Sequence, residues 1–357
     1  MSANDSSIDS GDAVGDGPDH DADPTDAFAV LGNEVRMTAL RALLDAEREA
    51  PRGENEDGAL TFSELFEATS ADETAGFAYH LRQLTDRFCR QTDDERYVLT
   101  YAGREIARAI RAGTYTDSVD VDPIAVDDPC PFCGATDLVA RGTDNYVAIG
   151  CHACGQPTLT LPFPPGGHRG HARENLLEAF DRHHRHRLAL LSDGVCPECS
   201  APAEARVGYH DGVDRDGDMP GHGSGGVDRD AVDLPDRDVD DVPDGATADS
   251  PDGVTADLPD GRPQVAFDCD HCGCRLRSPV TLAVLEHPAV VAFYHRHGVD
   301  VRERPLWNVG EEWGERVVSE DPWCVRVSTR LDGDVLSLFV AENLDVVETR
   351  ESSVTAS

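Results

Sequence analysis

The sequence contains no lysine, because all 31 of its basic residues are arginine, and these face 69 aspartate and glutamate residues. The formal net charge at pH 7 is −38. A surface of this kind stays soluble at very high salt, where charge repulsion is screened to a range of roughly 3 Å. The bias argues against an ordinary acidic mesophilic protein and resembles that of cytoplasmic proteins from salt-accumulating, halophilic archaea. It does not exclude nucleic acid as a partner.

Long apolar runs and a cationic N-terminus are also missing. No apolar stretch approaches the ~20 residues that a membrane-crossing helix needs. A secretory signal would need a positively charged start, which the aspartate-rich residues 1–26 do not offer. We therefore expect a cytoplasmic protein without a membrane partner, whose 11 cysteines are reduced. In that compartment, paired cysteines indicate metal ligation before disulfides.

Apolar residues are scarce as well, at 39% of the chain against a typical value of about 45–50%. The deficit is local, because two aspartate-rich segments carry −20 of the −38 charge. They predict a disordered acidic tail at 1–24 and a disordered acidic insert at 210–262. The insert repeats PDGATADS and PDGVTADL. Such Asp-Gly repeats can bind calcium in β-solenoids, but a low-complexity loop is the favoured interpretation.

Residues 25–118 predict three helices, two short strands and a last helix. Apolar residues from Phe28 to Leu44 are spaced for one helical face. Thr61 with Glu64 is a capping-box signature for a second helix, and Ser70 with Glu73 repeats it for a third helix over 72–87. Strands are expected at 90–92 and 96–99, and the last helix is expected to end at Gly113.

The third of these helices has two distinct faces. Its apolar residues form one stripe that we expect to be buried, namely Phe77, Leu81, Leu84 and Phe88. On the opposite face, Arg82 suits a guanine edge and Gln83 an adenine edge, while Tyr79 can reach a phosphate or sugar. His80 lies at the border, where core packing and DNA contact both stay open. The full set of candidate DNA contacts is Tyr79, His80, Arg82, Gln83, Arg87, Arg90 and Arg96.

Eight cysteines form two sets of paired C-x2-C motifs. The first set is Cys130, Cys133, Cys151 and Cys154, and the second is Cys196, Cys199, Cys269 and Cys272, with the acidic insert between its pairs. A two-residue gap lets both thiolates approach one ion at ~2.3 Å, so the sequence predicts two structural Zn²⁺ ions per chain. Iron in a rubredoxin-like site is the alternative for the first set. Cys274 is expected to be a free thiol, and Cys89 and Cys324 small buried hydrophobes.

The remaining segments connect these units and close the chain. Residues 162–168 predict a stiff connector, and 168–192 a connecting helix whose HHRH sequence at 183–186 is a polar face or a metal sensor. A helix over 282–298 should break or bend at Pro288. Alternation at Val325, Val327 and Thr329, with a turn at Asp332-Gly333, predicts an antiparallel C-terminal sheet.

Three stretches carry a resemblance to a known family. LGNEVRMTALRALL resembles the first-helix signature of ArsR-like archaeal transcription regulators, FAYHLRQL their recognition helix, and YVLTYAGREI the stretch that leaves the wing. The resemblance covers about a quarter of the chain. It implies a winged helix-turn-helix and a homodimer on two-fold related DNA. The whole chain looks like an uncharacterised haloarchaeal regulator family. The cysteine pair of arsenic-sensing members is absent from the third helix, so that activity is not expected.

These observations predict a multidomain α+β protein, with a winged helix-turn-helix followed by two zinc-ribbon-like units and a small antiparallel sheet. The expected segments are a tail at 1–24, a winged helix at 25–118, a first ribbon at 126–163, a helix at 168–192, a second ribbon at 193–298 around the insert 210–262, and a sheet at 299–350. We expect a DNA-binding transcription regulator without enzymatic activity, whose zinc-stapled C-terminal half is a sensor or partner module. The alternatives are an adaptor that binds RNA or the transcription machinery, and a metal-dependent enzyme.

Overall fold

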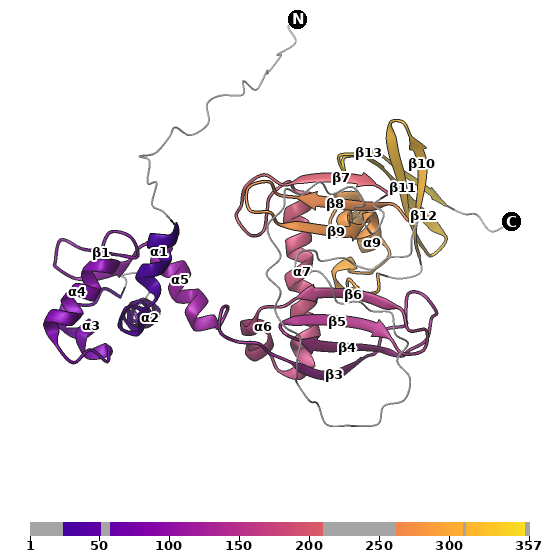
Figure 1. The fold of residues 1–357 in the computed structure, drawn as a ribbon. Helices are drawn as coiled ribbons and strands as arrows, with labels where there is room; N and C mark the ends of the chain where they lie inside the picture. The colour runs from indigo at the N-terminus through magenta and orange to yellow at the C-terminus, as the bar shows by residue number, and fades with distance from the viewer. Residues whose placement is uncertain (1–23, 51–57, 210–261, 310–311, 354–357) are drawn as a thin grey trace, which may run out of the picture. The chain divides into compact units, whose positions relative to one another are not determined.

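The computed structural model describes residues 24–50, 58–209, 262–309 and 312–353 (Figure 1). The predicted tail and insert lie outside these ranges, apart from their boundary residues Pro24 and Arg262. The chain divides into two compact units, residues 1–117 and 118–357, called here the N-terminal and the C-terminal unit. The architecture mixes helices with several small antiparallel sheets, as expected. Among the described residues, no helix has the length and apolar character needed to cross a membrane.

The N-terminal unit is mainly helical and packs one apolar core. Its elements are α1 (Pro24–Leu31), α2 (Glu34–Glu49), α3 (Phe62–Ala68), α4 (Thr74–Leu84), the hairpin β1 (Cys89–Gln91) and β2 (Tyr97–Leu99), and α5 (Tyr101–Ala112). The predicted single face from Phe28 to Leu44 is wrong, because Asn33 is extended and caps α2, so the chain breaks before Glu34. Phe28 of α1 is 69% exposed.

Local capping signals fix several ends of the N-terminal helices. The Thr61–Glu64 capping box is complete, with the Thr61 amide donating to Glu64 Oε2 at 2.7 Å. The second predicted box is wrong, because α4 begins at Thr74 after Glu73, and no side chain caps it. α5 ends at Gly113, which has the left-handed φ of 71°. α5 also packs closely on the segment before β1, since a Cβ on Gly103 would lie 1.7 Å from the Phe88 carbonyl oxygen.

The C-terminal unit contains three antiparallel sheets joined by α7 (Leu176–Ser192). The first sheet is β3 (Val121–Val126), β4 (Leu138–Thr143), β5 (Tyr146–Cys151) and β6 (Pro157–Pro162); the second is β7 (Glu204–Gly208), β8 (Gln264–Asp268) and β9 (Arg275–Pro279); the third is β10 (Trp313–Glu320), β11 (Trp323–Leu331), β12 (Asp334–Ala341) and β13 (Val346–Ser353). The inner strands of the first sheet, β4 and β5, lie between the two cysteine pairs of the first set, and β3 and β6 flank them. The remaining elements are α6 (Pro165–Gly170), η1 (Arg173–Asn175), α8 (Val280–Ala283), α9 (Pro288–Arg296) and η2 (Val301–Glu303).

α7 belongs to two cores at once. Leu176 and Phe180 in its first half pack with the first sheet, while Leu188 and Leu191 in its second half pack with the second and third sheets. In Figure 1 the helix runs beside both regions. It begins later than the predicted 168–192, because residues 165–170 form α6 in place of the expected connector. As predicted, Pro288 interrupts the helix over 282–298, and α9 begins there.

The third sheet follows its sequence pattern closely. Val325, Val327 and Thr329 are each at most 1% exposed, and Thr329 Oγ1 lies 2.9 Å from the Tyr294 hydroxyl of α9. The turn at Asp332-Gly333 has left-handed φ values of 50° and 89°, which suit a two-residue hairpin. α9 therefore covers the apolar face of this sheet and fixes it to the rest of the unit.

Candidate metal centres and nucleic-acid interface

Four cysteines come together at one end of the first sheet. Their sulfur atoms all lie within 4.8 Å of one another, with Cys130 Sγ 3.8 Å from Cys154 Sγ and Cys133 Sγ 3.8 Å from Cys151 Sγ. A tetrahedron of thiolates around an ion at ~2.3 Å places its sulfurs about 3.8 Å apart, whereas a disulfide needs about 2.05 Å. The arrangement therefore fits one metal ion and no disulfide.

The second cysteine set has the same geometry despite its long intervening segment. Cys196 Sγ lies 3.6 Å from Cys272 Sγ, and Cys199 Sγ lies 3.6 Å from Cys269 Sγ. The antiparallel pairing of β7 with β8, from Glu204–Asp268 to Gly208–Gln264, brings the two pairs together across the insert. The chain can thus hold two metal ions, one in each group.

Each of the four cysteine pairs adopts the same type of backbone turn. The amide of the first cysteine donates to a carbonyl five residues on, and its own carbonyl accepts from the amide four residues on. That fourth residue has a left-handed φ in each case, at Gly134, Gly155, Ser200 and Gly273. Glycine adopts this conformation without steric cost, which explains three of the four positions. The turn closes each pair around a common point.

The remaining cysteines lie outside both sulfur groups. Cys274 supplies the carbonyl that accepts from the Cys269 amide at 2.9 Å, and burial raises the pKa of its thiol to about 11. Cys89 is 0% exposed, as predicted, and burial raises its pKa to about 11. Cys324 is only half-buried in β11. Cys274 lies beside Cys196, but neither four-cysteine group includes any of these three thiols.

α4 presents a polar face opposite its buried stripe. Phe77, Leu81 and Leu84 are at most 3% exposed, whereas Tyr79 is 52% exposed and Arg82 and Gln83 are also exposed. The stripe packs into the core with α2 and α3, so the polar face is the outer one. In the part of the chain that the structure describes, neither Arg82 nor Arg90 pairs with a carboxylate.

The other candidate DNA-contacting residues are less exposed to solvent. Arg36 Nη1 of α2 donates to Nδ1 of the half-buried His80 at 3.3 Å, so this ring contacts the protein's own helix. Arg87 and Arg96 are half-buried near the hairpin. Hydrogen bonds from Thr61, with a smaller contribution from the charge of Arg96, lower the pKa of Glu64. The hairpin turn itself is acidic, with exposed Asp93, Asp94 and Glu95.

The histidine-rich part of α7 is only partly a polar face, since His186 is exposed and His183 half-buried, whereas His184 belongs to the core. His184 is 6% exposed, its Nε2 lies 2.9 Å from the Pro162 carbonyl oxygen, and its ring packs edge-on against Phe180. Burial lowers the pKa of His184 to about 3 and also lowers that of His168, which is 7% exposed. Within the described residues, these histidines form no metal-ligating group. His184 and His168 are neutral core residues.

Two family models match the chain. One, described as Domain of unknown function (DUF7351), matches residues 127–233 and 236–346, which is more than half of the chain. The other, described as Domain of unknown function (DUF7347), matches residues 24–110. No curated protein and no solved structure matches the chain. The two matches fall in the C-terminal and the N-terminal unit respectively.

Proposed function

The chain belongs to the DUF7351 family, and we propose that it is a DNA-binding transcription regulator whose N-terminal unit is a winged helix-turn-helix. Helices α2, α3 and α4, the hairpin β1–β2 and α5 follow one another in the order that such a domain requires. Recognition helices of this class enter the major groove with their exposed face. The outer face of α4 carries the proposal, because it combines exposed Tyr79, Arg82 and Gln83 on a helix anchored by its buried stripe.

Zinc in both cysteine groups is the second part of the proposal. Four thiolates at tetrahedral spacing are the donor set of structural zinc, and they leave no open position for substrate or water. We therefore assign the cysteine units the role of zinc ribbons that stabilise a sensor or partner module without catalysis. Rubredoxin-like iron would use the same four ligands in the first unit, and metal analysis distinguishes the two.

The proposal includes a homodimer on a two-fold related site. In α1 no residue is buried, although the helix contains Phe28, Val30 and Leu31. Phe28 exposes 69% of its surface, which is costly for an aromatic ring in water. Replacing Phe28 with glutamate should convert a dimer to a monomer in light scattering, while Tyr79→Glu on the outer face of α4 should leave the mass unchanged.

An adaptor that contacts the transcription machinery or RNA is the second candidate. Asp93, Asp94 and Glu95 at the hairpin turn favour it, because three carboxylates at this position repel phosphate groups. Molar salt further reduces the gain from counterion release. DNA binding by this chain must then depend on base contacts and shape more than on phosphate neutralisation, with a weaker dependence of affinity on salt than in a basic homologue.

Selection of binding sites from random duplexes in molar KCl tests the proposal. The wild-type protein should enrich a two-fold related sequence, and Arg82→Ala should weaken binding to it about 10- to 100-fold and relax the preference at one base position. Arg108→Ala is the matched control, since Arg108 is an exposed arginine of α5 that pairs with Glu105 at 2.9 Å. It should bind like the wild type.

The two candidates predict opposite results in this experiment. Enrichment that is equal for wild type and Arg82→Ala, or no enrichment at all, would favour the adaptor and remove α4 from the account. RNA or polymerase capture by the intact protein would then be the next measurement. Enrichment lost in both arginine variants would indicate a general charge effect rather than base recognition by α4.

A further inference from the structure

A cavity of about 340 Å³ lies in the C-terminal unit, between the second half of α7, the α8–α9 loop and the β12–β13 turn. Its volume falls within the range of small-molecule sites, roughly 300–1,000 Å³. Polar and aliphatic groups share its walls, and the aliphatic part comes mainly from Leu188, Leu282, Leu285, Leu306, Leu344 and Val346. The cavity therefore suits a small ligand with an aliphatic part.

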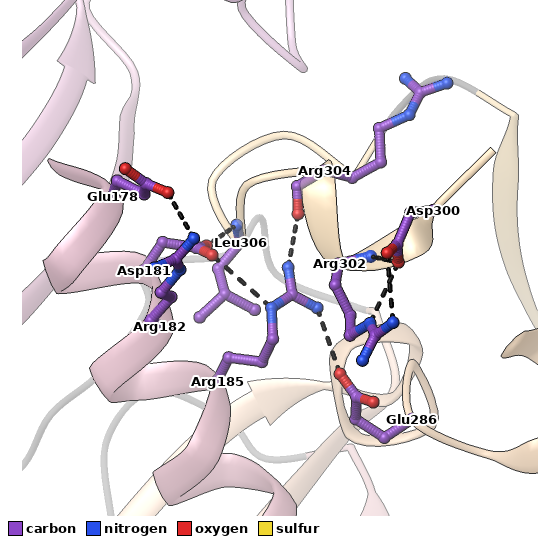
Figure 2. A network of polar contacts seen from close by, with 9 residues as sticks. All are labelled: Glu178, Asp181, Arg182, Arg185, Glu286, Asp300, Arg302, Arg304 and Leu306. Carbon is purple, nitrogen blue, oxygen red and sulfur yellow. Dashed lines mark hydrogen bonds and ion pairs between the residues drawn. The ribbon is translucent and has the colours of Figure 1, made fainter. Parts of the chain in front are cut away.

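Arg185 of α7 lines this cavity and is only 6% exposed. Figure 2 shows its guanidinium group between Asp181, Arg304 and Glu286. Nη2 donates to the Arg304 carbonyl oxygen at 2.5 Å, but Nε and Nη1 are buried and make no hydrogen bond within the described residues. The nearest carboxylate oxygens, of Asp181 and Glu286, lie 3.6 and 3.7 Å from them. Buried donors in this state gain from a carboxylate that can approach more closely.

The two acidic neighbours of Arg185 differ in how firmly their side chains are held. Asp181 is buried, and its Oδ1 accepts from the Leu306 amide at 2.6 Å, so it is held in place. The side chain of Glu286 is 40% exposed and can turn toward water. Asp193 and Asp345, which also line the cavity, are exposed too. Among the charged residues that line the cavity, Arg185 is thus buried, whereas Glu286, Asp193 and Asp345 lie toward solvent.

We propose that this cavity binds a free α-amino acid with an aliphatic side chain. The ligand carboxylate accepts a hydrogen bond from Nη1 of Arg185 and replaces Glu286 there. The ligand ammonium pairs with the displaced Glu286 and with Asp193 and Asp345. The side chain packs against the leucine walls. A simple carboxylic acid would be repelled by the three carboxylates and would have no ammonium group to pair with them. A simple amine would leave the buried Arg185 donors without a new acceptor. The assignment does not depend on DNA binding.

Calorimetric titration of the full-length, metal-loaded protein in molar KCl tests the inference. The probes are L-leucine, 4-methylpentanoate, which lacks the ammonium, and 3-methylbutylamine, which lacks the carboxylate. Leucine should bind once per chain, and each analogue at least about tenfold more weakly, because each loses one charged contact. Absence of leucine binding at millimolar concentrations, or equal binding of either analogue, would overturn the proposal.

Two variants locate the site. Ala189→Trp fills the cavity from a half-buried position and should abolish leucine binding, whereas Leu190→Trp, at an exposed neighbour outside the cavity, should not change it. Glu286→Gln removes the competitor for Arg185 and one ammonium partner. It should weaken leucine and strengthen 4-methylpentanoate, so that their affinities converge. Leucine affinity unchanged in Ala189→Trp, or both ligands shifted equally by Glu286→Gln, would contradict the site even if one variant folded poorly.

Discussion

The N-terminal unit packs one apolar core around α2 and α4, whereas the C-terminal unit divides its apolar side chains between two cores and adds a four-cysteine group to two of its sheets. A small unit built from a short sheet buries little apolar surface, so its stability often depends on an additional cross-link. Metal ligation can replace that missing core. The two units should therefore respond to different perturbations, even though they belong to one chain.

Metal removal should give the largest difference between the units. Structural zinc contributes an apparent ~10–16 kcal/mol per site at neutral pH, which exceeds the stability of a small domain. A strong chelator should therefore increase hydrogen exchange throughout β4, β5, β7 and β8, while α2 and α4 keep their protection. Equal loss of protection in both units would contradict the distinction.

Single cysteine variants test the same difference without a chelator. Cys133 is exposed, so Cys133→Ser removes a ligand with little loss of packing. The metal content should fall from two ions per chain to one. Cys324→Ser, at a half-buried thiol outside both groups, should keep two ions. Elemental analysis of the purified variants measures both, and an unchanged content in Cys133→Ser would remove the first site from the account.

A core substitution in the N-terminal unit should show the reverse sensitivity. Phe77 is 0% exposed and its ring centroid lies 5.1 Å from that of Phe62. Phe77→Ala should cost about 3–5 kcal/mol of unfolding free energy and unfold α2–α5, with the metal content intact. Tyr79→Ala, on the exposed face of the same helix, should change stability by less than about 0.5 kcal/mol. Denaturant unfolding of the two variants checks the difference.

Acid should weaken the C-terminal unit through its buried histidines. The folded pKa of His184 is about 3, well below an unfolded value near 6.5, so folding favours the neutral ring. The resulting stability is fully present above about pH 6.5 and is lost as pH falls toward about 3, by up to ~1.4 kcal/mol per pH unit.

The glutamine variant isolates this contribution from proton-driven metal release. His184→Gln keeps a donor for the Pro162 carbonyl but does not titrate. Between about pH 7 and 5, its C-terminal unit should lose less stability than the wild type. Parallel pH curves for the two proteins would show that His184 does not contribute.

The smallest effect should come from the one cysteine turn without glycine. Ser200 has a left-handed φ of 62°, where the other three turns have glycine. Ser200→Gly should stabilise the second cysteine unit by about 1 kcal/mol or less, and Gly155→Ser should destabilise the first by a similar amount. A Cβ on Gly155 meets no atom within 4 Å, so no clash complicates the comparison. Shifts of equal sign in a metal-competition titration would contradict the argument.

Local signals in the sequence predicted much of this fold. The Thr61–Glu64 box, Gly113, Pro288 and the Asp332-Gly333 turn each act within a few residues, and each fixed an element end where expected. The grouping of the eight cysteines also followed from the spacing within each pair. It needed only the assumption that a long insert adds little to the cost of loop closure.

Long-range contacts account for what the sequence did not predict. Asp181, His184 and Arg185 look like a solvated helix face, yet they are buried because residues 304–306 and the first sheet cover α7. The hydrogen-bond partners of the Asp181 and Arg185 side chains lie more than 100 residues away in the sequence, so they leave no periodic signal around residue 181. The Ser70–Glu73 box was wrong because Glu73, not Ser70, is the residue that precedes α4, and no side chain caps the helix there. The outer strands β3 and β6 were also missed.

Genome-wide crosslinking of the tagged protein in its own host, with wild type, Arg82→Ala and Arg108→Ala compared side by side, tests whether α4 recognises DNA. Wild type and Arg108→Ala should occupy discrete sites that share a two-fold related sequence, and Arg82→Ala should lose that sequence preference. Sites that persist unchanged in Arg82→Ala, or a wild-type signal that follows RNA polymerase without any shared sequence, would contradict recognition of DNA by α4.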